Sequence, residues 1–311
     1  MNWRSLARTA GYLLVALIVF FLGRALYRSW NQIPFDRITF NYGWLATSFL
    51  GLVVSFLCSV QAWRSILRAL GSRMGFRDSW FVITGSYAAK YLPGHVWAIG
   101  GRMLLARGKG VPEKVSGVAM VLETAALLAG TLIAFGLCLP WMVRDGLPQW
   151  IWWLFLPVPP ILALMFTPLL GRAVGFAARV AFKREVRVAI GAPGLLAALA
   201  LFTLSAIIQG AAFFALVRSL YPIAPRLLPD VIGAYTGAWA AGFLSVVTPG
   251  GLGVREGALT VMLGTYVTVP VAIIAAAVAR LWITVFEVAM AMAGLRMKSS
   301  SAPSETIRER S

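Results

Sequence analysis

Six apolar runs of about 20 residues or more dominate this sequence of 311 residues. A helix needs about 20 apolar residues to cross a bilayer, so each run is long enough to span a membrane. Only 13% of the residues are charged, which leaves too little polar surface for a soluble domain of this length. The sequence therefore predicts an all-α polytopic membrane protein, with crossings at residues 7–26, 42–63, 115–139, 148–170, 193–217 and 271–295.

The formal net charge is +17, and the basic residues gather in the short connections between the apolar runs. Residues 64–77 hold four arginines, and residues 102–114 and 172–187 are also basic. The positive-inside rule predicts that these connections and both termini lie on the cytoplasmic side of a bacterial inner membrane. No nucleic-acid-binding motif accompanies the charge, so we expect membrane lipids as partners and no nucleic acid.

Two further apolar segments are each broken near the middle. Residues 79–101 lie between two basic connections on the same predicted side and contain Pro93 and Gly94. At 1.5 Å per residue each arm reaches only ~20 Å, so we expect a re-entrant helical hairpin that enters from the cytoplasm. Residues 231–266, broken by a Pro-Gly-Gly sequence, predict a second hairpin that enters from the opposite side.

Each predicted hairpin is flanked by two crossings, and the two units have opposite orientations. This arrangement predicts an inverted repeat whose broken helices meet near the membrane midplane, a plan typical of transporters. Residues 1–298 are expected to form one transmembrane domain, and residues 299–311 a disordered cytoplasmic tail.

The first hairpin breaks within the sequence AKYLPGHVWAIGGR at residues 89–102. Proline and glycine end one helix and expose the N-terminus of the next, whose free N–H groups favour an anion. Lys90 and Arg102 flank the break and can together hold a phosphate. The alternative is a simple kink with two cations that extend to the membrane surface. His95, the only histidine, can relay protons or serve as a structural hydrogen-bonding residue.

The second hairpin breaks within the sequence TPGGLGVREG at residues 248–257. Its four glycines allow positive φ angles or a close approach of two backbone segments. Arg255 and Glu256 follow inside an otherwise apolar region. A charge at that depth costs a few kcal/mol unless it is paired or hydrated, so it marks either a transport pathway or a structural ion pair.

Isolated charges also occur within two crossings. Glu123 lies in the third, and Arg280 and Glu287 lie in the last. A separation of seven residues puts Arg280 and Glu287 on one helix face, and Arg280 can meet Glu123 or Glu256 from another helix. Proton or ion coupling and a structural lock are both open for these residues. The sequence has no metal-ligand spacing, so we expect neither a metal nor a cofactor.

The two hairpin motifs resemble those of the flippase-like family, which includes the transmembrane region of lysylphosphatidylglycerol synthases. The resemblance extends over about 11–295 and implies two oppositely entering re-entrant hairpins that move a lipid between leaflets. The residues to which it points are Lys90, Pro93, Gly94, Arg102, Glu123, Pro249, Gly250, Gly251, Gly253, Arg255 and Glu256.

The sequence and the resemblance together lead us to expect a flippase for an anionic phospholipid or a polyprenyl-phosphate-linked glycolipid. The basic residues Lys90, Arg102 and Arg255 would neutralise the phosphate. Two alternatives stay open: an intramembrane lipid-modifying enzyme that uses Glu123 and Glu256, and a non-transporting partner of an envelope or lipid-biosynthesis enzyme. No catalytic motif occurs, and no aminoacyl-transferring domain follows the last crossing, so we do not expect lysyl transfer. Association with further copies of the same chain, as a homo-oligomer, is also an open alternative.

Overall fold

The computed structural model describes residues 40–90, 95–143, 191–245 and 253–296, together with the isolated residues 153, 156, 159, 160 and 251. Every regular element with described bounds is helical. The elements are α2 (Tyr42–Ala69), α3 (Phe76–Lys90), α4 (His95–Arg107), α5 (Glu113–Met142), α8 (Ala192–Leu220), the short 3-10 helix η5 (Pro225–Leu227), α9 (Leu228–Leu244), α10 (Val254–Leu263) and α11 (Val269–Arg296).

Four of these helices are long and apolar enough to cross a membrane: α2, α5, α8 and α11. They confirm long apolar helices at the predicted crossings 42–63, 115–139, 193–217 and 271–295, although each helix is longer than the predicted segment. The predicted crossing at 7–26 lies outside the described residues, and so does 148–170 apart from four isolated residues, so a total of six crossings stays a prediction. The length and hydropathy of the four described helices indicate an integral membrane protein.

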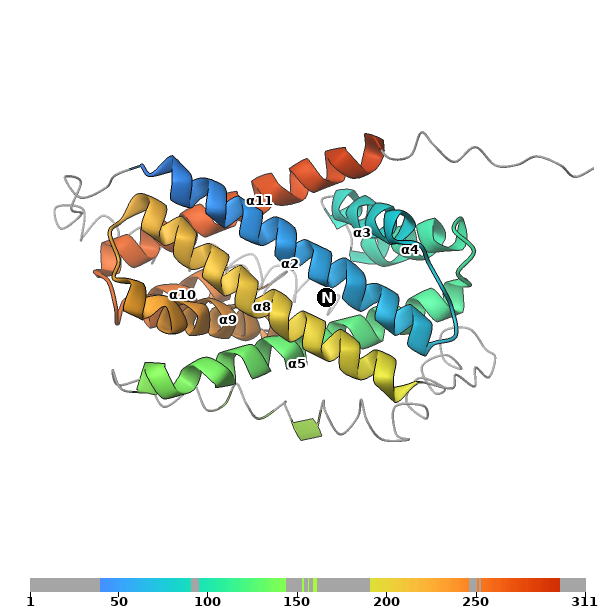
Figure 1. The fold of residues 1–311 in the computed structure, drawn as a ribbon, viewed down its shortest axis with the longest axis horizontal. Helices are drawn as coiled ribbons and strands as arrows, with labels where there is room; N and C mark the ends of the chain where they lie inside the picture. Colours follow the sequence, from blue (N-terminus) through green and yellow to red (C-terminus); the bar gives the residue numbers. More distant parts are fainter. Residues whose placement is uncertain are drawn as a thin grey trace, which may run out of the picture.

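Helices α2 and α8 run antiparallel and pack along most of their lengths (Figure 1). Small residues allow this close approach. A Cβ atom on Gly51 would lie 2.6 Å from the Cβ of Ala212, and a Cβ on Gly194 would lie 2.8 Å from the Cβ of Ala69. Because lipid tails are as apolar as side chains, van der Waals packing between small residues is a main source of helix association in membranes.

The short helices form two pairs at opposite ends of the bundle (Figure 1). Helices α3 and α4 pack together at the end where α2 terminates, and α9 and α10 pack together at the other end. With 15 and 13 residues, α3 and α4 are each shorter than the ~30 Å hydrocarbon core. The two predicted breaks fall between these helices, one after Lys90 and the other after Leu244. The re-entrant topology and the inverted repeat stay predictions.

Helix α5 packs against α8 and α9, and α11 packs against α3 and α10. The long helices therefore link the two short pairs. Residues from all eight of the α-helices given above meet in the interior between them.

Candidate functional site

A cavity of about 440 Å³ lies inside the bundle, near the middle of the four long helices. Each of the eight α-helices with described bounds contributes at least one residue to its lining. Charged side chains at this depth are costly, and they commonly face a hydrated path or one another. The charged residues that line the cavity are Arg102, Glu123, Arg255, Arg280 and Glu287.

Arg102 of α4 and Glu123 of α5 form a two-pronged ion pair on one side of this cavity. The Nη1–Oε2 distance is 2.7 Å, and Nη2 donates to Oε1 over 3.1 Å. The two side chains are only 9% and 16% exposed. The guanidinium carbon of Arg102 also lies 4.0 Å from the ring centroid of Trp63, which is fully buried. Arg102 is therefore held by a carboxylate and an aromatic face.

This pairing differs from the arrangement that the sequence suggested, in which Lys90 and Arg102 hold a phosphate together. The backbone of Lys90 ends α3 and that of His95 begins α4, whereas their side chains lie outside the described part of the structure. Pro93 and Gly94 lie outside it as well. Any anion that binds Arg102 would have to share it with Glu123 or displace that carboxylate.

Arg255 of α10 reaches the cavity from the opposite hairpin motif. Its Nη2 donates a hydrogen bond of 2.9 Å to the hydroxyl of Tyr235, and its guanidinium carbon lies 5.2 Å from the Tyr235 ring centroid. Tyr235 is buried and stacks on Phe213, with 5.0 Å between ring centroids. Among the described residues Arg255 forms no ion pair. Within the described residues Arg255 therefore has only neutral partners, whereas Arg102 is paired with a carboxylate.

The local sequence explains how Arg255 reaches this position. Gly251 and Gly253 have φ angles of +68° and +83°, in the left-handed region that glycine adopts without strain. A Cβ on Gly251 would overlap the carbonyl of Gly242, so α9 and the turn before α10 touch through their backbones. The glycines thus have the positive φ and the close approach that the motif predicted. Pro249 and Gly250 lie outside the described residues.

Glu256 closes the first turn of α10. Its carboxylate accepts a 2.6 Å hydrogen bond from the backbone N–H of Gly253, which satisfies a donor that the helix N-terminus leaves free. Its other oxygen lies 3.8 Å from Nη1 of Arg280. Of the two partners that the sequence allowed for Arg280, the structure therefore brings Glu256 close. Arg280 and Glu287 both line the cavity, in agreement with their predicted position on one face of the helix.

A chain of hydrogen bonds across α2, α8 and α9 was not predicted. The Oγ atom of Ser205 lies 2.8 Å from that of Ser55 and 3.2 Å from that of Ser59. Gln209 donates to Ser55 over 3.3 Å and accepts from the Tyr235 hydroxyl at 3.5 Å. The series of hydrogen bonds thus extends from α2 to Tyr235, which binds Arg255 of α10. The available signal was two polar pairs at i, i+4 on otherwise apolar helices.

The cavity therefore combines guanidinium, hydroxyl and amide donors with two carboxylates. Its volume falls within the range of about 300–1,000 Å³ that is usual for small-molecule sites. Arginine forks suit the oxygens of a phosphate, and hydroxyl and amide groups suit the polar parts of a headgroup. The described part of the chain contains no cluster of three or more His, Cys, Asp or Glu side chains that could hold a metal ion.

Residues 8–291 match the family model described as "Lysylphosphatidylglycerol synthase TM region". The matched range includes every residue that lines the cavity. No curated protein matches the chain.

Proposed function

Since the chain belongs to the family of the lysylphosphatidylglycerol synthase transmembrane region, we propose that it moves an anionic, phosphate-containing lipid between the leaflets of a bacterial inner membrane. The family suggests a role connected with membrane lipids. The chemistry of the cavity supports a headgroup that carries negative charge. An anionic phospholipid and a polyprenyl-phosphate-linked glycolipid both meet this requirement.

The position and the partners of Arg255 are the observation that carries this proposal. It lies at the cavity wall, and within the described residues its side chain contacts a hydroxyl and a ring rather than a carboxylate. An arginine at membrane depth that is not paired with a carboxylate is costly, and a phosphate in the cavity would supply a negative charge within pairing distance. The tyrosine bond holds the guanidinium in place, so little side-chain entropy is lost when the anion binds.

The cavity needs to accept only the headgroup. Each CH₂ group that leaves the hydrocarbon phase costs about 0.8 kcal/mol, so the acyl or polyprenyl chains would stay in the bilayer while the polar part passes through the protein. In this proposal the pairs α3–α4 and α9–α10 act as re-entrant hairpins from opposite sides. The contacts of Arg102 with Glu123 and of Arg280 with Glu256 would then close the pathway or couple it to protons.

Leaflet exchange in liposomes tests the proposal. The full chain is reconstituted, and the movement of labelled phosphatidylglycerol, of a labelled polyprenyl-phosphate lipid and of labelled phosphatidylcholine is followed. We expect exchange of at least one anionic lipid and a rate about tenfold or more lower for Arg255→Ala, because one charge-assisted hydrogen bond contributes about 1.5–3 kcal/mol. Arg226→Ala, which removes an exposed arginine of η5, should leave the rate unchanged.

Two results would contradict the proposal. Full exchange by Arg255→Ala would remove the role given to that residue. No exchange of any of the three lipids by folded wild-type protein would count against transport itself. A change in the mass of the lipid would instead favour an intramembrane enzyme.

A further inference from the structure

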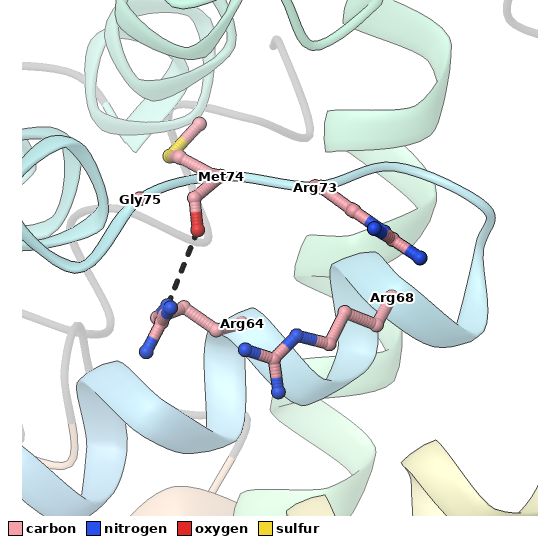
Figure 2. Close-up of a pocket in the computed structure, with 5 residues that line it drawn as sticks. All are labelled: Arg64, Arg68, Arg73, Met74 and Gly75. Atoms are coloured by element: carbon pink, nitrogen blue, oxygen red, sulfur yellow. Dashed lines mark hydrogen bonds between the residues drawn. The ribbon is translucent and has the colours of Figure 1, made fainter.

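A second pocket lies at the end of α2, apart from the central cavity. It has a volume of about 570 Å³ and shares no lining residue with the cavity. Figure 2 shows its lining, which consists of Arg64, Arg68, Arg73, Met74 and Gly75. Three arginines therefore meet at one pocket, and no acidic side chain lines it among the described residues.

The end of α2 explains why the arginines converge. The backbone N–H of Ser72 donates to the Leu67 carbonyl over 2.8 Å, and that of Gly71 donates to the Arg68 carbonyl over 3.0 Å. With Gly71 at φ +76°, these two bonds form a Schellman motif that ends the helix and reverses the chain. The loop that follows returns over the last turns of α2. Arg73 thus comes to lie opposite the arginines of the helix.

Arg64 is held in place before any ligand binds. Its Nε donates to the carbonyl of Met74 over 3.2 Å, and its Nη1 donates to Oε1 of Gln61 over 2.7 Å. The guanidinium carbon also lies 5.7 Å from the ring centroid of Phe76. These contacts use two of the five N–H donors of the group and fix its plane, so the remaining donors are pre-positioned.

Arg68 and Arg73 are exposed, and neither forms an ion pair within the described part of the chain. In Figure 2 the side chain of Arg68 extends along α2 toward Arg64, and Arg73 points from the loop toward the end of the helix. Interfacial arginines ordinarily set topology and extend separately into water. Here Arg64, Arg68 and Arg73 all line one hollow, whose positive charge favours an anion.

We infer that this pocket is a binding site for a phosphate group. Guanidinium forks match phosphate oxygens, and several such contacts add geometric specificity to the charge attraction. The pocket lies at the end of α2, a helix that is long and apolar enough to cross a membrane. The end of such a helix falls where lipid headgroups meet water. The phosphate can belong to an anionic phospholipid or to a soluble phosphate. The inference does not depend on the proposed function of the cavity.

Binding to the purified full chain in neutral detergent tests the inference. The ligands are dioctanoyl phosphatidylglycerol, dioctanoylglycerol, which has the same chains without the phosphate, and inorganic phosphate at matched ionic strength. Affinity is measured for wild type, for the double variant Arg68→Ala with Arg73→Ala, and for a charge-matched double variant, Arg77→Ala with Arg107→Ala. The last pair removes two exposed arginines outside the pocket.

For wild type we expect saturable binding of the phospholipid and no binding of dioctanoylglycerol. The affinity for the phospholipid should be about tenfold or more lower in Arg68→Ala with Arg73→Ala, and unchanged in the charge-matched variant. Restoring charge with Arg68→Lys and Arg73→Lys should recover part of this loss. Inorganic phosphate that binds equally well and competes with the lipid would identify a soluble phosphate site. Wild type that binds neither phosphate ligand, or an equal loss in both alanine double variants, would overturn the inference. The leaflet-exchange rate of Arg255→Ala tests the proposed function of the cavity and does not bear on binding at this pocket.

Discussion

The guanidinium of Arg255 donates a hydrogen bond of 2.9 Å to the hydroxyl of Tyr235, and that hydroxyl in turn lies 3.5 Å from Oε1 of Gln209. One phenol thus connects the glycine-rich motif before α10 to the polar side chains of α8. The ring of Tyr235 is buried against Phe213, so its position is fixed by packing. Arg255 therefore occupies a defined place in the cavity rather than a range of rotamers.

Tyr235→Phe separates the hydroxyl from the ring. The stacking on Phe213 and the cation–π contact remain, whereas Arg255 loses a hydrogen-bond partner. We expect a leaflet-exchange rate between those of wild type and Arg255→Ala, and a stability loss of about 1–3 kcal/mol from the unsatisfied buried groups. Thermal unfolding in detergent measures the second effect. Tyr221→Phe, outside the cavity, is the matched control; equal losses in both variants would contradict the assigned contact.

The ion pair of Arg102 and Glu123 gives a prediction about stability. Removing one member of a buried pair leaves an unpaired charge, which costs about 3–5 kcal/mol, whereas replacing both by apolar residues is often nearly neutral. Glu123→Leu should therefore lower the unfolding midpoint strongly, and the addition of Arg102→Met should restore most of it. A double-mutant cycle by thermal unfolding gives the coupling energy.

A second arginine–glutamate pair of the same protein provides the control for this cycle. Arg107 and Glu113 lie 2.9 Å apart, but their side chains are 70% and 37% exposed. Exposed pairs contribute only about 0–1 kcal/mol, so the same cycle on this pair should show little coupling. Comparable coupling energies for the two pairs would mean that the cavity is as well hydrated as the surface.

The sequence predicted the four long apolar helices because a bilayer imposes a minimum length on an apolar helix that crosses it. The predicted ends of these helices were less accurate. The arginines that follow Trp63 predict the end of the second crossing at that residue, yet α2 continues to Ala69. Charge marks the limit of the hydrocarbon phase, while helical hydrogen bonds continue until the backbone turns. Gly71, with its positive φ, is the residue that marks this end.

The partners of the charged residues could not be predicted in the same way. Glu123 and Glu256 were equally available to Arg280, because one sequence does not say which helix faces are adjacent. Contact between Ser55 and Ser205 likewise depends on the packing of α2 against α8, through small residues whose pairing no local pattern specifies. The glycine motif was more informative, since a backbone requirement such as a positive φ is local to the sequence.

Two glycines of that motif should respond differently to the same substitution. Gly251 has φ +68°, and its added Cβ would overlap the carbonyl of Gly242, whereas a Cβ on Gly257 would meet nothing within 4 Å. Gly251→Ala should therefore lower both the unfolding midpoint and leaflet exchange. Gly257→Ala, inside α10, should be neutral or stabilise by about 0.5–1 kcal/mol. Thermal unfolding and exchange assays of both variants compare them; a tolerated Gly251→Ala would contradict the backbone contact between α9 and the turn.

Arg280 allows a structural lock to be distinguished from a role in the pathway. Its contact with Glu256 is long, at 3.8 Å, and its side chain is 40% exposed, so the pair should contribute less than about 1 kcal/mol to stability. Glu256 also keeps its bond to the N–H of Gly253 when Arg280 is removed. We therefore expect Arg280→Gln to fold with a nearly unchanged midpoint and to lower leaflet exchange, because the cavity loses a cation beside the path of the headgroup. A strongly lowered midpoint would instead identify a lock between α10 and α11. Unchanged midpoint and exchange would remove Arg280 from the pathway.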